Sequence, residues 1–357
     1  MGREVVGELL ALNCHVRLLV RHPEKVPAFP NQANHPRVEL VQGDVLKPET
    51  LPAAMAGVQA VIHLVGIIAE TAHVAYEQAH TAATRNLLTA AKQAGVTRWI
   101  QMSAIGTRPY ARSRYHRTKW EAEQLVRQSG LDWTIFRPSL IYGYDERDRL
   151  LNLLRHTFSW PLDLIQLYSF PLLNGGESHI QPVSVREVAR CFALAPAKQA
   201  AIGRTYDLVG LVAFTWREMA VKITNALGKK SLYEEIPLLL LVRVLLWLTA
   251  ILLPYLIVAG LVWHTLSLVM AEIGAGLSVA LILIAYRWRR IILFCVPGEP
   301  LILASETLNL LAPRELRLSE VLKMAVEDNV GDPRPAAETF AYVPETFEQG
   351  LAKVYRI

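Results

Sequence analysis

The chain has 357 residues, of which 52% are hydrophobic and 19% are charged, and its formal net charge is +5 at pH 7. This apolar content is too high for a typical soluble enzyme, whereas the charged content fits a globular part joined to an apolar part. No basic run is interleaved with aromatic residues, which disfavours a nucleic-acid partner, and the positive charge suits an anionic lipid surface. The three scattered cysteines and ten histidines without ligand spacing argue against a disulfide framework and a metal site.

Apolar, β-branched runs alternate with helix-like stretches along the first two thirds of the chain. Six runs predict strands: His15–Val20, Val38–Val41, Ala60–Val65, Trp99–Met102, Trp133–Phe136 and Thr205–Val209. Three stretches predict helices: Arg3–Leu12, Ala75–Ala94 and Arg114–Ser129. This alternation predicts an α/β fold with a Rossmann-like, doubly wound parallel sheet, whose ligands bind at the carboxyl ends of the strands. Four residues fall at those ends: Arg21, Asp44, Gly66 and Ser103.

Tyr115 and Lys119 lie four residues apart on the third predicted helix and therefore share a face. A phenol with a pKa near ~10 exchanges protons poorly at neutral pH unless a nearby cation stabilises its anion. We expect Lys119 to supply that cation and Tyr115 to act as general acid or base. Ser103, twelve residues before Tyr115, would polarise the substrate oxygen. The spacing therefore predicts a carbonyl-reducing site.

Several motifs then identify a family. They are Ser113–Lys119, Ser129–Ile135, Arg137–Ser139, His63–Ile68, Thr84–Leu87, Met102–Gly106 and Gln181–Val185, with Glu327–Val330 and Thr346–Leu351 near the end. The chain resembles the atypical short-chain dehydrogenase/reductase family, which is NAD(P)-binding and epimerase/dehydratase-like. Within that family it is similar to the branch that contains the nucleotide-binding accessory subunit of respiratory complex I and its stand-alone bacterial relatives. The resemblance covers about residues 2–235 and 318–357.

The resemblance implies a nicotinamide dinucleotide site made by Gly2, Arg21, Asp44, Val65, Gly66, Tyr115, Lys119, Arg137 and Pro138. In relatives, the residue matching Asp44 contacts the adenine, and the Val65–Gly66 turn lies beneath the nucleoside. Arg21 stands where NAD-specific relatives have an acidic residue, and an arginine there suits the 2′-phosphate of NADP(H). Two plainer readings stay open. Arg21 could be an ordinary surface residue, and Ser103, Tyr115 and Lys119 could serve only to hold the nicotinamide ribose.

The start of the chain departs from the family. The opening Met1–Val6 resembles the sequence that begins at the last glycine of the Gly-rich phosphate turn, so the first strand and most of that turn are missing. Three explanations stay open: a start site assigned too late or a fragmentary gene, a scaffold that has lost its pyrophosphate cradle, and weak binding by the residual site.

The second large feature is Val244–Tyr286, 43 residues without Lys or Arg in which Glu272 is the single carboxylate. Two spans of about 20 residues each match a hydrocarbon core of about 30 Å. We therefore expect a transmembrane hairpin of two helices, Val244–Trp263 and Thr265–Tyr286. Basic residues outside both ends predict that the nucleotide domain lies on the cytoplasmic face, at the inner membrane in a bacterium. The alternatives are an apolar helical pair buried in a soluble assembly and an interfacial hairpin.

These patterns predict three parts: a nucleotide-binding domain with a small substrate-side lobe at 1–235, the hydrophobic insertion at 236–300, and a segment at 301–357 that packs back on the first. Three functions stay open. The first is a membrane-tethered NAD(P)(H)-binding protein linked to respiratory complex I or quinone metabolism, with a structural or sensing nucleotide. The second is an active NADP-dependent oxidoreductase or epimerase on a lipid-like or quinone-like substrate. The third is a truncated scaffold without nucleotide. The expected partners are the dinucleotide, membrane lipid and respiratory-chain or quinone-related proteins.

Overall fold

The computed structural model describes residues 1–26, 36–143, 168–226, 230–234, 290–296, 302–303, 306 and 319–355. It divides into two compact units. The first comprises Met1–Tyr144, Ser178–Phe214 and Ile302–Gly350, and the second comprises Asp145–Glu177, Thr215–Leu301 and Leu351–Ile357. The predicted boundaries at residues 235 and 300 stay a prediction.

The first unit is built on parallel strands. Four of them form one sheet in the order β10-β5-β4-β3, with bounds β3 Ala60–His63, β4 Arg98–Met102, β5 Asp132–Pro138 and β10 Arg204–Leu208. Two more, β1 Val16–Val20 and β2 Val38–Gln42, form a separate parallel pair. No strand in the described ranges pairs with both β1 and β3, so the hydrogen-bonded sheet is interrupted between them.

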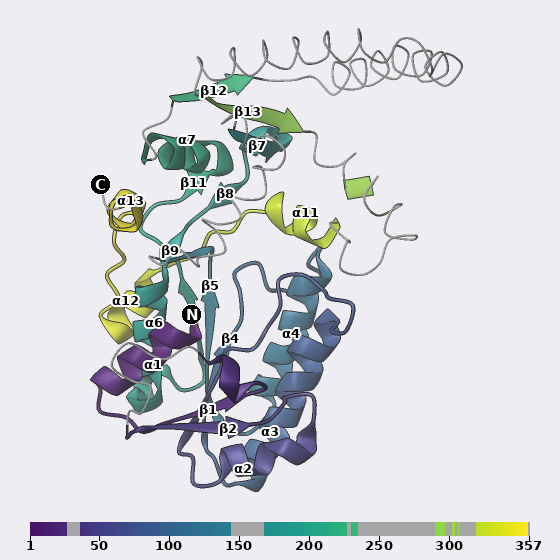
Figure 1. The fold of residues 1–357 in the computed structure, drawn as a ribbon, viewed down its shortest axis with the longest axis vertical. Coiled ribbons are helices and arrows are strands. Elements are labelled where there is room, and N and C mark those ends of the chain that lie inside the picture. Colours follow the sequence, from purple (N-terminus) through teal and green to yellow (C-terminus); the bar gives the residue numbers. More distant parts are fainter. Residues whose placement is uncertain are drawn as a thin grey trace, which may run out of the picture. The chain divides into compact units, whose positions relative to one another are not determined.

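Helices cover both faces of these strands. The α-helices of the described residues that begin in this unit are α1 Gly2–Ala11, α2 Leu51–Met55, α3 Ala83–Gln93, α4 Arg114–Arg127, α6 Val185–Leu194, α11 Ser319–Ala325, α12 Arg334–Phe340 and α13 Phe347–Tyr355. Figure 1 shows α3 and α4 on one side of the strands and α1, α6 and α12 on the other. Short strands β6 Ile141–Tyr142, β8 His179–Ile180 and β9 Val183–Ser184 complete the unit.

Successive residues of the buried strands pack into two different apolar cores. Trp99 and Ile135 pack among residues of α2 and α3, whereas Ile100 and Phe136 pack among residues of α6 and α12. All four side chains are fully buried. Successive side chains of a strand point to opposite faces, so a strand covered by helices on both faces is apolar throughout. The α/β, Rossmann-like, doubly wound architecture expected from the sequence is therefore present.

The second unit contains a three-stranded parallel sheet in the order β12-β13-β7, with bounds β7 Tyr168–Leu173, β12 Lys230–Glu234 and β13 Arg290–Val296. Helix α7, Trp216–Ala226, belongs to the same unit.

The predicted transmembrane hairpin is corrected. Among the described residues, no helix is both long and apolar enough to cross a bilayer. The longest helix there, α4, has 14 residues and therefore rises about 21 Å, less than the roughly 30 Å of a hydrocarbon core. The spans predicted within Val244–Tyr286 lie outside the described residues. The same finding overturns the predicted membrane localisation with a cytoplasmic nucleotide domain.

Candidate active site

A serine cap sets the start of helix α4. The hydroxyl of Ser113 accepts a hydrogen bond from the N–H of His116 at 3.2 Å. A serine at this capping position satisfies an N–H group that has no partner within the helix. The cap places Tyr115 in the first turn of α4 and Lys119 one turn later on the same face.

The side chain of Lys119 reaches the carboxyl end of β4. Its Nζ donates a hydrogen bond to the carbonyl of Met102 at 3.2 Å. The next residue, Ser103, is buried; its N–H donates to the Phe136 carbonyl at 2.7 Å, and its hydroxyl donates to the Thr107 hydroxyl at 3.3 Å. Lys119 therefore lies against the backbone beside Ser103, at the strand end where ligands of parallel sheets bind.

Tyr115 is a half-buried phenol in an aromatic surrounding. The rings of His80, His116 and Tyr76 meet its ring edge to face, at centroid distances of 5.3, 5.1 and 6.0 Å. Burial raises the pKa of Tyr115 to about 12. Within the described part of the chain, its hydroxyl has no hydrogen-bond partner and Lys119 contributes no lowering of that pKa. The phenol is therefore protonated at neutral pH, and its raised pKa makes it a weaker acid than an exposed tyrosine.

Lys119 is buried, and burial lowers its pKa to about 8, although nearby Glu123 acts in the opposite direction. Its ammonium also explains the glycine at position 66. A Cβ at Gly66 would lie 2.9 Å from the Lys119 Nζ and 3.5 Å from the His80 ring. The backbone of this turn therefore packs against the Lys119 ammonium and the His80 ring, and a side chain here would require the end of the flexible Lys119 side chain to shift.

The side chain of Arg137 is held by a buried carboxylate. Its Nε and Nη2 donate to the two oxygens of Glu123 at 2.8 and 2.7 Å, and the Glu123 side chain is fully buried. The carbonyl of the following residue, Pro138, accepts a hydrogen bond from the Ile105 N–H at 3.1 Å. The role of Arg137 and Pro138 at a cofactor stays a prediction, and the Arg137 guanidinium already binds within the protein.

The other predicted nucleotide residues follow successive strands or begin a helix. Gly2 is the first residue of α1, and no side chain caps that helix end within the described residues. Arg21 follows β1 and is exposed. Asp44 follows β2, and its carboxylate accepts the Leu46 N–H at 3.0 Å, which stabilises its own turn. Val65 follows β3 and is 41% exposed. Their contacts with a nucleotide stay predictions.

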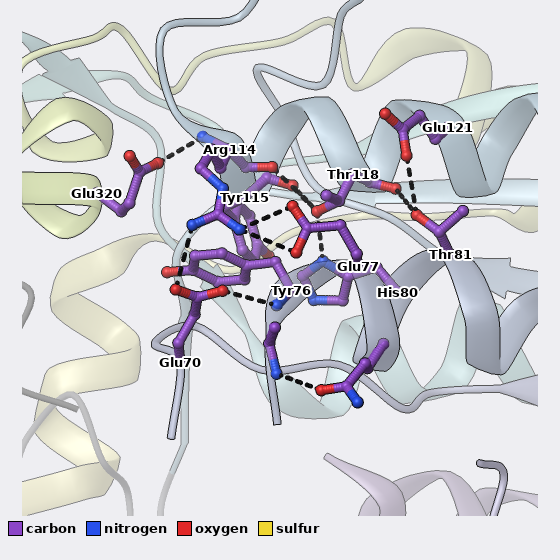
Figure 2. A network of polar contacts seen from close by, with 12 residues as sticks. Glu70, Tyr76, Glu77, His80, Thr81, Arg114, Tyr115, Thr118, Glu121 and Glu320 are labelled. Atoms are coloured by element: carbon purple, nitrogen blue, oxygen red, sulfur yellow. Dashed lines mark hydrogen bonds and ion pairs between the residues drawn. The ribbon is translucent and has the colours of Figure 1, made fainter. Parts of the chain in front are cut away.

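A network of carboxylates surrounds Arg114 at the start of α4 (Figure 2). The guanidinium donates to Glu70 at 3.2 Å and to Glu77 at 2.8 and 2.9 Å. Glu320 of α11 accepts a hydrogen bond from the Arg114 N–H. The second oxygen of Glu70 accepts the Tyr76 N–H at 3.1 Å. The network joins the loop after β3, the start of α4 and a helix 206 residues further along the chain.

The segment after α11 also contacts the strand ends of the first unit. Glu327 forms an ion pair with Arg108 at 2.8 Å. The Ser139 hydroxyl donates to the carbonyl and side-chain oxygens of Asn329 at 2.9 and 2.8 Å. This part of the closing segment therefore borders the loops that follow β4 and β5.

Sequence reasoning missed His80, Arg114 and Glu320 as members of this site. His80 lies on a predicted helix with no motif of its own. Arg114 stands beside Tyr115 but is one of many basic residues. Glu320 lies 206 residues after Arg114 in the sequence and comes close to it only in the folded chain. The available signal was the position of Arg114 within the motif Ser113–Lys119.

Comparisons with known families give two matches. Residues 1–154 match the family described as NAD(P)H-binding. Residues 106–238 match the family described as RmlD substrate binding domain.

Among individual proteins, a mitochondrial NADH dehydrogenase [ubiquinone] 1 alpha subcomplex subunit 9 of Arabidopsis thaliana is 30% identical over 66% of this chain and 58% of its own length. The chain thus spans less than two thirds of that relative. An NAD(P)H azoreductase of Xenophilus azovorans is 27% identical over 67% of this chain and 74% of its own.

Two solved structures share the fold. A triphenylmethane reductase of Citrobacter has a TM-score of 0.63 at 15% identity, covering 100% of this chain and 96% of its own. The NADPH-dependent quinone oxidoreductase of Escherichia coli, solved with NADPH, has a TM-score of 0.62 at 15% identity, covering 99% and 96%. At such identities the likeness concerns the fold alone.

Proposed function

Because this chain belongs to the NAD(P)-binding, atypical short-chain dehydrogenase/reductase and epimerase-like family, we propose that it is an NAD(P)H-dependent oxidoreductase whose proton donor is Tyr115. One observation carries the proposal. The Tyr115 phenol is protonated at neutral pH, and its hydroxyl has no hydrogen-bond partner in the described part of the chain. A proton donor without an internal partner is available to a substrate.

The residues on the nucleotide side fit a dinucleotide. Among the described residues no side chain caps the start of α1 at Gly2, and helix starts of this kind bind a pyrophosphate. At Gly66 the bare backbone lies close to the Lys119 ammonium, which a side chain at this position would meet. The exposed Arg21 offers a guanidinium at the end of β1. When bound, the reduced nicotinamide would supply a hydride.

The chain's own residues would supply the proton. Tyr115 donates its phenolic proton to the substrate oxygen as that oxygen gains negative charge. For the Lys119 ammonium to stabilise the resulting phenolate, it would have to leave the Met102 carbonyl that it binds in the described structure. The Ser103 hydroxyl polarises the same oxygen. One hydride and one proton reduce a carbonyl to a hydroxyl, so a quinone-like acceptor is the proposed substrate class. One relative is an NAD(P)H azoreductase, and one structural neighbour is an NADPH-dependent quinone oxidoreductase.

We propose NADPH rather than NADH as the preferred donor. Arg21 is exposed, and its guanidinium forms no ion pair with another described residue. A free guanidinium at the end of β1 suits a 2′-phosphate, because arginine binds phosphate through two parallel hydrogen bonds.

A second candidate function is a nucleotide-binding subunit beside the respiratory chain, in which the nucleotide is structural. Two observations favour it. A complex I subunit of Arabidopsis thaliana and the 40 kDa subunit of NADH-ubiquinone oxidoreductase of Neurospora crassa are 30% and 21% identical to this chain. In addition, the Lys119 ammonium is bonded to the Met102 carbonyl and does not lower the pKa of Tyr115 in the described structure.

The test is NADPH oxidation with a short-chain quinone by the chain and by its Tyr115→Phe variant. We expect Tyr115→Phe to lower turnover by about 10²-fold or more while nucleotide affinity, measured by calorimetry, stays nearly the same. The matched control is Tyr110→Phe, because Tyr110 is 92% exposed and should tolerate the change. A chain that binds NADPH but reduces no acceptor would favour the structural nucleotide, and full turnover by Tyr115→Phe would contradict the assigned proton donor.

A further inference from the structure

The imidazole of His80 connects the turn after β3 to helix α4 (Figure 2). His80 is 1% exposed. Its Nε2 lies 3.2 Å from the N–H nitrogen and 3.2 Å from the carbonyl of Ile67, and its Nδ1 lies 2.8 Å from the Thr118 hydroxyl. Ile67 follows the Val65–Gly66 turn directly, and Thr118 lies between Tyr115 and Lys119. One side chain therefore joins the nucleotide side of the site to the helix that carries the proton donor.

The hydrogen bonds favour one tautomer of this imidazole. The Thr118 hydroxyl lies 3.0 Å from the carbonyl oxygens of Arg114 and Tyr115, to which it can donate. A hydroxyl used in this way accepts a hydrogen bond from the Nδ1–H of His80, which leaves Nε2 to accept the N–H of Ile67. This arrangement pairs every donor in the group: the Ile67 N–H, the His80 Nδ1–H and the Thr118 hydroxyl.

The linking imidazole is neutral. Burial lowers the pKa of His80 to about 2, and the ammonium of Lys119 acts in the same direction. A doubly protonated ring would lose its acceptor for the Ile67 N–H, so the link depends on the neutral form. The same ring lies 3.5 Å from the position of a Cβ at Gly66, so it also packs against the turn that it holds.

His80 reaches this position from an irregular turn of helix. Residues Glu77–Ala82 form a π-helix directly before α3. The carbonyl of His80 accepts the hydroxyl of Thr84 at 2.6 Å, and Thr84 is itself 3.2 Å from the ring of His63. Such π-turns occur frequently at functional sites, because the extra residue redirects a side chain at a cost in helix regularity.

We propose that His80 is a positioning residue that keeps the Gly66–Ile67 turn in register with Tyr115 and Lys119. The role rests on the proposed oxidoreductase function, since the turn would lie against the nucleotide and Tyr115 against the substrate. Without the link, the turn and α4 shift independently, and a displacement of about 1 Å between reacting groups can cost about 10²-fold in rate.

The test compares His80→Leu, which removes both hydrogen bonds, with His80→Gln, which keeps an amide that can donate and accept. We expect His80→Leu to lower kcat by roughly 10- to 100-fold with a change of only a few-fold in nucleotide affinity, and His80→Gln to recover part of the loss. The matched control is Thr81→Val. Thr81 joins the same π-helix to α4 through Glu121 at 3.1 Å and through the Thr118 carbonyl at 3.4 Å. Among the described residues its hydroxyl forms no hydrogen bond with the turn, and its loss should leave kcat within about two-fold.

A readout without turnover separates this inference from the proposed function. In the free protein, backbone hydrogen exchange at Ile67 should become at least about 10-fold faster in His80→Leu and stay unchanged in Thr81→Val. If the chain reduces no acceptor, this exchange experiment still decides the role of His80. If His80→Leu does not fold, His80→Gln gives the same comparison on a smaller scale. Unchanged exchange and kcat in the folded His80 variants, or equal losses in Thr81→Val, would overturn the proposal.

Discussion

Glu123 binds Arg137 through both carboxylate oxygens, at 2.8 and 2.7 Å, and its side chain is fully buried. Arg127 adds a third contact at 3.3 Å from the same helix. The carboxylate therefore joins β5 to α4, one helical turn after Lys119. Because it also raises the pKa of Lys119 against the effect of burial, the same residue supports the fold and the charge of the site.

The first prediction concerns this ion pair. Glu123→Ala leaves the largely buried guanidinium of Arg137 without a partner, and breaking such a pair typically costs about 3–5 kcal/mol. We expect a loss of that size in the free energy of unfolding, measured by urea denaturation.

The control is Glu39→Ala, which breaks the ion pair of Arg17 and Glu39 at 2.7 Å, where the Glu39 side chain is 59% exposed. A pair in contact with solvent contributes about 1 kcal/mol or less. Equal losses in the two variants would show that Glu123 has no special structural role.

The second prediction concerns the nucleotide preference. Arg21→Asp replaces an exposed guanidinium with a carboxylate that repels a 2′-phosphate. We expect the affinity for NADPH to fall by about 1–3 kcal/mol while the affinity for NADH changes little. Titration calorimetry with both nucleotides measures the difference. Equal affinities of the unchanged protein for NADPH and NADH would remove the proposed role of Arg21.

Much of this architecture follows from the sequence. The strands around Trp99 and Ile135 are short apolar runs between helix-like stretches, and a parallel sheet covered on both faces requires such runs. The spacing of Tyr115 and Lys119 fixes their common face in any α-helix that contains them. The local sequence pattern is sufficient to predict these strands and this shared helix face.

Other features depend on tertiary contacts. The π-helix around His80 interrupts a helix predicted as continuous, because no periodicity distinguishes the extra residue. Glu320 reaches the Arg114 N–H across 206 residues, and no local rule finds such a pair. Strand β13, Arg290–Val296, was overlooked because a short apolar run beside a long one reads as its continuation. The predicted effect of Lys119 on the pKa of Tyr115 depends on where the ammonium points, which the sequence does not show. In the structure the ammonium points to the Met102 carbonyl.

The third prediction is the pH dependence of turnover. Burial lowers the pKa of Lys119 to about 8, whereas the pKa of Tyr115 is raised to about 12. Above pH 8 the lysine loses the charge with which it would stabilise the phenolate on leaving the Met102 carbonyl, while Tyr115 still carries its own proton. We therefore expect kcat/KM to fall as the pH rises through about 8, with no second decline before about 12. A flat profile from pH 7 to 10 would contradict the role of Lys119.

The last prediction concerns acid stability. Burial lowers the pKa of His63 to about 3, of His80 to about 2 and of His116 to about 4, all below the ordinary value of 6.5. In acid the unfolded chain binds protons that the folded chain does not, so stability present above pH 6.5 is lost as the pH falls below it. Each histidine contributes about 1.4 kcal/mol per pH unit, and three contribute about 4 kcal/mol per unit between pH 6 and 5.

Urea denaturation at pH 7, 6 and 5 measures this slope. His63→Gln should reduce it by about one third, because one proton fewer is taken up on unfolding. His22→Gln is the comparison variant, since the His22 side chain is 58% exposed, and a reduction as large as that of His63→Gln would show that burial is not the cause. His63 is the better choice for this test, because it contacts Thr84 at 3.2 Å and, within the described residues, forms no hydrogen bond with the Gly66–Ile67 turn that His80 holds. If the slope of His63→Gln equalled that of the parent, the neutral, buried state of this histidine would be wrong.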